Sequence, residues 1–405
     1  IKKIKFNCKY EFQAWKSWEN KPVVIMIHGH GLSKNSWINP YEEKYQNCNL
    51  KFKGLLTDYR HNPTEKDAGI HDGPPQSAFL QFGFSKPLEY LELPPKSLWD
   101  FLKENGYNLA TWSQKNPDNN IEEAIDELTS YVIPTVKKLF KTNSVVLAGH
   151  GRGGLIARKY AELYYDKRKD VSGIIMMGTP HQGTNLSRFN KELSVLFSSL
   201  CIFIDEEAPL SSLLSTVLNG VPDQKNININ VLDEAIEKQA LMIKNIKIFF
   251  SQMQTFFASC ALEQMSSTSD FISSLKEEKK HGIYYSSICG TENTFTKMYL
   301  WFYKSTSFIS HKSNKQYQWI IQPREITKIL DIVEKLLPRI LIPRELTKNK
   351  GDGLVSIESA RLPFSDETHS FHLNHLDLLV NYSVKEKIIK VLEKITQRNL
   401  NSKDD

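Results

Sequence analysis

Short runs of consecutive apolar residues alternate along this chain with segments in which apolar residues recur every three or four positions. Unbroken apolar runs are typical of strands buried on both faces of a sheet, and the longer spacing is typical of helices with one buried face. Strands are predicted at 22–31, 108–113, 144–149, 171–180 and 282–291, and helices at 97–107, 121–140, 154–165 and in a closing segment through Lys394. This alternation predicts an α/β fold, a mostly parallel sheet flanked by helices.

Two predicted helices carry recognisable local signals. In the helix at 97–107, Leu98, Phe101 and Leu102 share one face, and Gly106 ends the helix. In the helix at 121–140, the ring of Pro134 removes a backbone donor, so we expect a kink there.

Three segments interrupt the alternating pattern. Residues 41–97 are rich in turn formers, and we expect a hairpin or a strand extension with long loops. Residues 184–280 are expected to be a helical insertion, because one apolar stripe joins Leu232, Ile236, Ile243, Ile246, Phe250, Met253 and Phe257. Residues 297–350 form a third, basic and aromatic insertion. The expected organisation is thus a core in two parts, 1–183 and 281–405, separated by the insertion at 184–280.

The most specific chemical signal is the stretch SVVLAGHGRGGLIARKY at 144–160. A predicted strand enters a tight turn flanked by Gly149 and Gly153, and a predicted helix follows. G-x-S-x-G in that context is the nucleophile elbow, which presents a reactive serine at the end of a strand. Gly151 stands where the serine is expected, so the nucleophilic oxygen is missing.

Four segments together resemble the lipase and esterase branch of the α/β-hydrolases. VIMIHGHGLSKNSW resembles the oxyanion loop, and GHGRGGLIARKY resembles the elbow with Arg and Tyr on its helix. MMGTPHQGT resembles the GTPH-x-G turn after the next strand. GDGLVSIESARL and NHLDLL resemble the loops of the acid and the histidine. The resemblance implies an α/β-hydrolase fold in which 184–280 is a cap or lid over an acyl pocket. A helix packed permanently on the core would explain the same stripe, and both explanations remain open.

The resemblance places the triad acid at Asp352 and the base at His375, with Gly151 at the nucleophile position. The chain order nucleophile, acid, histidine is the order that this fold uses. His369 and His372 are rival bases, but they alternate along a short strand instead of lying on the loop. The other acid position of this fold, after the preceding strand, reads MMGTP and holds no carboxylate.

The oxyanion hole is expected to consist of the backbone N–H groups of His30 and Arg152, with their side chains incidental. Phe249 and Phe256 lie off the apolar stripe and favour a cap that contacts lipid. Four further residues near the expected site are interpreted as framework: hydrogen-bonded His28, His150 and His181, and an inert buried thiol at Cys289.

Composition narrows the function only slightly. A net charge of +6 from 52 basic and 46 acidic residues is spread along the chain, which argues against nucleic acid as a partner. No apolar run reaches 18 residues, and no CxxC or other ligand cluster indicates a metal or a cofactor. Of the five cysteines, Cys8 and Cys48 could pair in an oxidising compartment, whereas Cys201, Cys260 and Cys289 lie in apolar sequence. The first residue is Ile1, so a removed signal peptide stays open, as do a secreted and a cytoplasmic location.

Two hypotheses about function follow. In the first, the chain is a lipid or ester hydrolase of the Ser-Asp-His type that Gly151 makes nearly inactive. In the second, it is a natural pseudoenzyme that binds a lipid or a protein through the former pocket. Contact with a membrane through the insertion at 184–280 is an expectation of either hypothesis. The presence of Asp352, His375 and the oxyanion segments favours the first hypothesis.

Overall fold

The computed structural model describes residues 11–40, 79–82, 96–191, 194–195, 198, 251, 254–293, 298–308, 316–325 and 343–401. Its centre is a seven-stranded sheet in the order β1-β4-β2-β5-β6-β7-β10. The strands are β1 (Phe12–Trp15), β2 (Val23–Ile27), β4 (Asn108–Trp112), β5 (Val145–His150), β6 (Val171–Met177), β7 (Tyr284–Gly290) and β10 (Glu367–Phe371). Every neighbouring pair is parallel except β1 with β4. The predicted mostly parallel sheet is therefore confirmed.

Burial explains why most of these strands can be predicted from the sequence. Every residue of β2, β4, β5 and β6 is buried, which requires unbroken apolar runs. The edge strand β1 was not predicted. Its four residues are all half-buried, so the sequence FQAW carries neither an apolar run nor a clear alternation.

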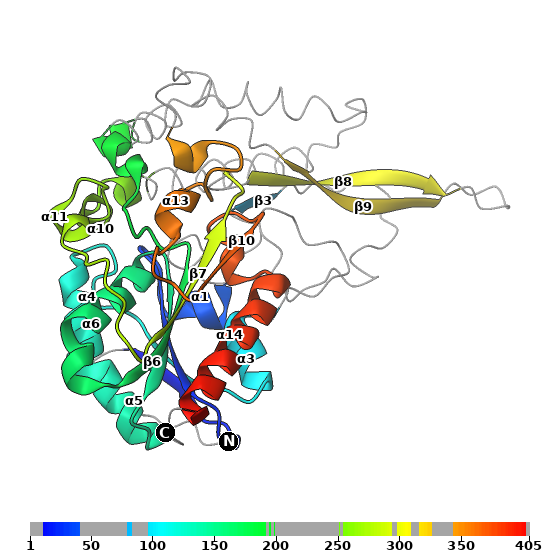
Figure 1. The fold of residues 1–405 in the computed structure, drawn as a ribbon. Coiled ribbons are helices and arrows are strands. Elements are labelled where there is room, and N and C mark those ends of the chain that lie inside the picture. Colours follow the sequence, from blue (N-terminus) through cyan, green and yellow to red (C-terminus); the bar gives the residue numbers. More distant parts are fainter. Residues whose placement is uncertain are drawn as a thin grey trace.

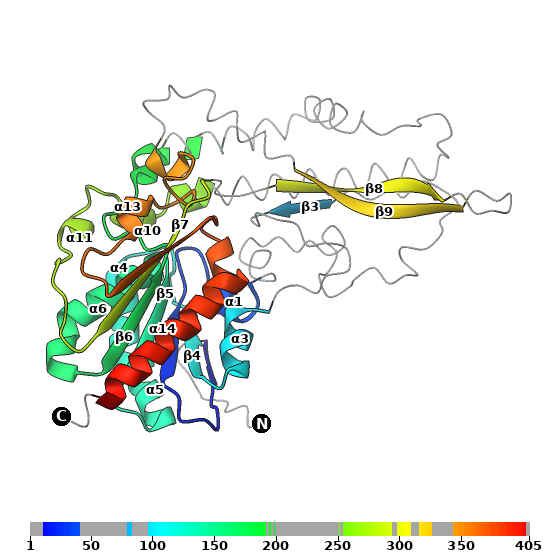
Figure 2. The same ribbon diagram turned by 45° about the vertical axis from the view of Figure 1, so that its right-hand side comes forward.

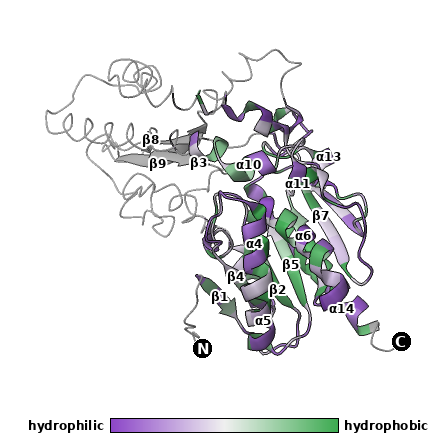
Figure 3. Cartoon of the chain, turned by 90° about the vertical axis from the view of Figure 1, so that its left-hand side faces the viewer, coloured by the Kyte–Doolittle hydropathy of each residue, from purple (hydrophilic) through white to green (hydrophobic). Residues whose placement is uncertain are grey.

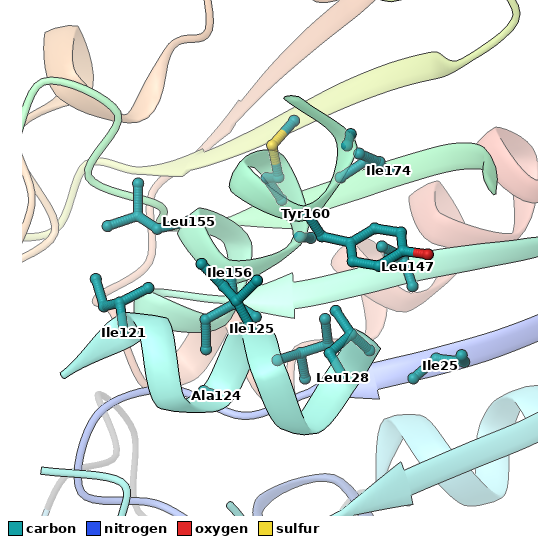
Figure 4. Close-up of a cluster of buried hydrophobic side chains, with 14 of the residues drawn as sticks. Ile25, Ile121, Ala124, Ile125, Leu128, Leu147, Leu155, Ile156, Tyr160 and Ile174 are labelled. Atoms are coloured by element: carbon teal, nitrogen blue, oxygen red, sulfur yellow. The ribbon is translucent and has the colours of Figure 1, made fainter. Parts of the chain in front are cut away.

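Helices cover both faces of the sheet (Figure 1). One face packs against α4 (Ile121–Glu127), α5 (Ile133–Phe140) and α6 (Arg152–Arg168), and the other packs against α3 (Leu98–Glu104) and the closing helix α14 (Tyr382–Asn401). Alternate strand residues supply the two cores, with Ile25 in the first and Val24 in the second. Figure 4 shows the first core, where Ile121, Ile125 and Leu128 meet Leu155, Ile156 and Tyr160 above the sheet.

Hydropathy follows this layering. In Figure 3 the strands β2 and β5 are hydrophobic, and the polar faces of α4 and α5 point away from them. The helix predicted at 121–140 is divided by a π-helical turn, Leu128–Val132. Pro134 lies in the first turn of α5, directly after the π-helical turn, and it has no N–H to donate to that turn. The irregularity expected at Pro134 thus appears just before it.

The short helical segments lie near the carboxyl ends of the strands (Figure 2). They are α1 (Asn35–Ile38), η2 (Asn185–Phe189), α10 (Cys260–Gln264), α11 (Asp270–Ser273), η5 (Arg344–Leu346), α13 (Ile357–Ala360) and η6 (Asp377–Leu379). Of the apolar stripe expected at 184–280, Phe257 is buried in the core, and the other six members lie outside the described residues. The cap therefore stays a prediction.

A second, three-stranded sheet joins the other two segments that interrupt the alternating pattern, 41–97 and 297–350. β3 (Phe79–Phe82) pairs antiparallel with β8 (Met298–Phe308), which pairs antiparallel with β9 (Gln316–Glu325). Figure 2 shows β8 and β9 extending away from the central sheet. The strand expected within 41–97 thus pairs with the insertion at 297–350, a pairing that nothing in either segment indicates locally.

Candidate active site

Gly151 occupies the turn between β5 and α6, as the elbow pattern predicts. Its backbone has φ +52° and ψ −119°, a conformation that residues with a side chain rarely adopt. The turn also brings the start of α6 against β2, because a Cβ on Gly153 would lie 2.2 Å from the carbonyl oxygen of Ile27. The glycine pattern is therefore explained by backbone geometry, and the shape of an elbow persists although the serine is absent.

Asp352 and His375 form a buried pair. The imidazole Nδ1 of His375 lies 2.7 Å from Oδ2 of Asp352, and the Asp352 side chain is 0% exposed. The other carboxylate oxygen accepts the N–H groups of Leu354 (3.0 Å) and Val355 (2.7 Å). These bonds hold the carboxylate in one orientation. With Nδ1 donating to Asp352, the lone pair of the imidazole is on Nε2.

The structure brings the three predicted positions together. A Cβ built on Gly151 would lie 3.0 Å from Nε2 and 3.5 Å from Cε1 of His375, and among the described residues it would meet no other heavy atom within 4 Å beyond the adjacent residues. A side chain at position 151 would therefore be in direct contact with Nε2 of His375. The two rivals are engaged elsewhere, His369 with Glu367 at 2.9 Å and His372 with Glu292 at 3.1 Å.

His150 supports the ring of His375 from behind. Its Nε2 donates to the backbone oxygen of His375 over 2.9 Å, and the two ring centroids are 4.4 Å apart. Burial holds the pKa of His150 well below its usual value, and the nearby His375 lowers it further. His150 is therefore neutral, and it does not compete with His375 for a proton at neutral pH.

His28 is held in one tautomer. Its Nε2 accepts the backbone N–H of Gln114 over 2.9 Å, so its proton is on Nδ1, which donates to the oxygen of Gly29 over 2.9 Å. Burial lowers the pKa of His28 to about 3. His181 is also buried and lies 3.4 Å from the guanidinium of Arg158. The three histidines interpreted as framework are all buried and bonded.

The side chains of His30 and Arg152 were expected to be incidental to the oxyanion hole. In the structure, each makes several polar contacts. Nε2 of His30 lies 2.8 Å from Oγ of Ser259 and 3.1 Å from Oδ1 of Asp118. The guanidinium of Arg152 is buried and donates to the backbone oxygens of Asn119 and Asn120. Burial lowers the pKa of Arg152 to about 10, which leaves the side chain charged at neutral pH.

Two cysteine expectations are tested by burial. Cys289 is fully buried, and burial raises the pKa of its thiol to about 12, so it is not a replacement nucleophile. Cys260, placed by the sequence in apolar surroundings, is exposed, and its thiol lies 2.9 Å from Oδ1 of Asn120. The reason is that Cys260 begins the short helix α10 on its solvent side. Cys8, Cys48 and Cys201 lie outside the described residues.

Phe256, which in the sequence favours a cap that contacts lipid, lies beside His30 in the structure. Its ring is half-buried and stacks on His30 with centroids 4.3 Å apart, and lipid contact stays a prediction. Phe256, which lies off the helical stripe, thus contacts an aromatic ring on a loop that is distant in sequence. Phe249 lies outside the described residues.

Sequence reasoning missed four polar residues around the site: Gln114, Asp118, Ser259 and Glu345. Each lies on a loop, at a helix end or in a short 3-10 helix, and each contacts residues distant in sequence. The buried carboxylate of Glu345, for example, accepts the backbone N–H of Asn185 over 2.7 Å, and its backbone oxygen accepts the N–H of Gly353 next to Asp352. No local pattern marks such residues.

Within the described ranges, no three His, Cys, Asp or Glu side chains are grouped so that they could hold a metal ion. The same ranges hold no helix that is both long and apolar enough to cross a bilayer.

The sheet and the helices on both of its faces define the class of this protein. It has an α/β-hydrolase fold, with a mostly parallel sheet in which β5 enters the elbow. More particularly, residues 115–277 match the family model described as the PGAP1-like alpha/beta domain. The match includes the elbow and ends before the acid and histidine loops.

Solved structures give a further comparison. Lipase BlEst2 of Bacillus licheniformis is 12% identical, with 94% of this chain and 97% of that chain covered and a TM-score of 0.46. MenH from S. aureus is 12% identical (96% and 100% covered, TM-score 0.36), as is a thermophilic esterase from Thermogutta terrifontis (95% and 93%, TM-score 0.37). No curated protein sequence matches the chain.

Proposed function

We propose that this chain is the scaffold of a lipid or ester hydrolase of the Ser-Asp-His type, nearly inactive because glycine occupies the nucleophile position. The observation that carries the proposal is the His375–Asp352 bond of 2.7 Å, with Nε2 of the same histidine 3.0 Å from the position of a Cβ on Gly151. Burying a carboxylate and an imidazole that have no function would lower the stability of the fold without benefit. Here both groups are also oriented by further hydrogen bonds.

The reaction follows from these positions once a serine stands at position 151. Its hydroxyl would lie next to Nε2 of His375, which takes the proton while the oxygen attacks the ester carbonyl. Asp352 stabilises the imidazolium. The backbone N–H groups of Arg152, at the first position of α6, and of His30 stabilise the oxyanion. His375 then protonates the departing alcohol, and water releases the acid from the serine by the same steps in reverse.

Gly151 stops this sequence at its first step, because it has no oxygen to attack with. Serine proteases that lose their nucleophile fall about a million-fold in turnover and keep roughly a thousand-fold over water. We expect the same scale here. The chain as it stands should bind an ester in the site, polarise its carbonyl and turn it over at a rate close to background.

Restoring the serine tests the proposal. Gly151→Ser should hydrolyse nitrophenyl esters, and a series of acyl lengths would show which ester class the site takes. The variant should also react covalently with a fluorophosphonate, whereas the chain with Gly151 should not. A folded Gly151→Ser protein that neither hydrolyses any ester of the series nor reacts with the fluorophosphonate would refute the proposal.

The missing nucleophile at Gly151 also favours a second function, a pseudoenzyme that retains an acyl ligand or a protein partner at the former site. Native mass spectrometry of the purified protein separates the two. A retained acyl ligand or partner, together with an inactive Gly151→Ser variant, supports binding. An empty chain that becomes active on Gly151→Ser supports the hydrolase.

A further inference from the structure

One loop, residues 114–120 between β4 and α4, contacts both segments that are predicted to supply the oxyanion hole. From the elbow side, the buried guanidinium of Arg152 donates to the backbone oxygens of Asn119 (2.8 Å) and Asn120 (2.9 Å). It also donates to the side-chain oxygen of Gln114. The side chain that follows the nucleophile position is therefore fixed to this loop by three hydrogen bonds.

From the opposite side, the segment that contains His30 is fixed to the same loop. Gln114 donates its backbone N–H to Nε2 of His28 over 2.9 Å and its amide to the oxygen of His28 over 3.0 Å. Two residues further on, Nε2 of His30 lies 3.1 Å from Oδ1 of Asp118. Gln114 thus bonds both oxyanion segments at once, through Arg152 and through His28.

The end of the insertion at 184–280 joins this arrangement. Oγ of Ser259 lies 2.8 Å from Nε2 of His30, the same atom that contacts Asp118, and the ring of Phe256 stacks on His30. The backbone N–H of Ala261 donates to the backbone oxygen of Asp118 over 3.0 Å. The short helix α10 is therefore bonded to the loop at the residue that contacts His30.

The chemistry of Arg152 shows that ion pairing is not its main role. Within the part of the chain that the structure describes, its hydrogen bonds go to neutral oxygens, although burial of a guanidinium without a bonded carboxylate is costly. A buried polar network of this kind makes the local structure rigid and fixes one arrangement. Rigidity matters most where backbone donors must be placed before the reaction begins, because preorganised donors are what stabilises a developing oxyanion.

We propose that the side chains of Arg152, Gln114, Asp118 and His30 form a positioning network that sets the spacing of the two oxyanion donors. Its role in turnover rests on the proposed hydrolase function, but its role in ordering the backbone does not. These are positioning residues, because they act on the substrate only through the N–H groups of His30 and Arg152. Ser259 extends the network to α10, so the insertion contributes to the order of the oxyanion loop.

Asp118 offers the sharpest test, because its side chain is half exposed (52%) and its removal leaves the core intact. Asp118→Ala removes the acceptor for His30, whereas Asp118→Asn keeps an oxygen there and should preserve the bond. Asp126→Ala is the matched control, since it removes an exposed carboxylate from the adjacent helix α4.

The first measurement uses the chain as it stands and needs no activity. Hydrogen exchange of the peptide that covers 28–33 should become about tenfold faster in Asp118→Ala, because the loop opens locally more often. Asp118→Asn and Asp126→Ala should leave exchange unchanged. Unchanged exchange in Asp118→Ala, or an equal rise in Asp126→Ala, would overturn the network.

The second measurement repeats the three substitutions in the Gly151→Ser background. Asp118→Ala should lower kcat about tenfold with little change in KM, less than the hundred- to thousand-fold cost of losing an oxyanion donor outright. Asp118→Asn should restore kcat, and the pH profile set by His375 should not move. A lower melting temperature with unchanged kcat would reduce Asp118 to a structural residue and overturn the positioning role. If Gly151→Ser has no activity, the hydrolase function fails, and the exchange experiment decides the network alone.

Discussion

Gly151→Ser changes activity and stability in opposite directions, and the structure sets both magnitudes. The backbone at position 151 has φ +52°, where a residue with a side chain is strained by roughly 1 to 3 kcal/mol. The new Cβ would also lie 3.0 Å from Nε2 of His375, a close contact that small movements of the ring can relieve. We expect a loss in the free energy of unfolding of about 1 to 2 kcal/mol, which in a chain of this size lowers the melting temperature by about 1 to 2 °C.

The gain in activity should be far larger. The full cost of a missing nucleophile is about a million-fold, and a site with a ready base and acid should regain at least about a thousand-fold, or about 4 kcal/mol of the activation barrier. The assay is hydrolysis of nitrophenyl esters at saturating concentration, with melting followed by circular dichroism on the same preparations.

Gly151→Ala is the matched control, because it places a Cβ in the same strained backbone but supplies no oxygen. It should show the same stability loss as Gly151→Ser and no gain in turnover. Adding His375→Ala to Gly151→Ser should return the rate to background. The reasoning is refuted if a folded Gly151→Ser protein is no faster than Gly151→Ala, or if it is more stable than the chain with glycine.

Three further predictions use the titrating groups of the site and the core. In the Gly151→Ser background, Asp352→Asn should lower kcat by about ten-thousand-fold, because an amide favours the wrong tautomer of His375; a fall smaller than tenfold would contradict the pairing. Urea unfolding should show stability decreasing as pH falls from 6.5 towards 3, since burial lowers the pKa of His28 to about 3 and the unfolded chain takes up the proton first; a flat profile would contradict this. Lys385 is buried, and burial lowers its pKa to about 8, so between pH 8 and 10.5 the unfolded chain holds more protons and stability should rise with pH. Lys385→Met should remove that rise, and an unchanged slope would argue against burial as its cause.

Much of the site was predictable because it depends on local geometry. Gly149, Gly151 and Gly153 mark a turn whose backbone crowds β2, and that crowding acts over only a few residues of chain. The Asp352 loop and the His375 loop also carry short signatures that occur in a known order. The distance between His375 and Gly151 was not predictable from spacing. It depends on how β5 and β10 are placed in one sheet.

The parts that sequence reasoning missed share one physical property. β1 is half-buried at an edge, so its residues are under little pressure to be apolar. Gln114 and Asp118 lie on a loop with no periodic pattern, and their partners are His28, His30 and Arg152, which lie far away in sequence. A side chain that acts through one distant contact leaves no repeat in the chain.

The sequence by itself determined the layered α/β fold, the elbow, and the absence of a nucleophile at Gly151. Those properties follow from burial periodicity and from turns that only glycine tolerates, both of which act between near neighbours. Only the tertiary structure decided how close His375 lies to Gly151 and how the segments of His30 and Arg152 are joined by one loop. It also decided that β3 pairs with β8 across more than two hundred residues. Such contacts depend on packing between elements. Many residue types can fill the space between two elements, and the chain that connects the elements does not specify which residues meet.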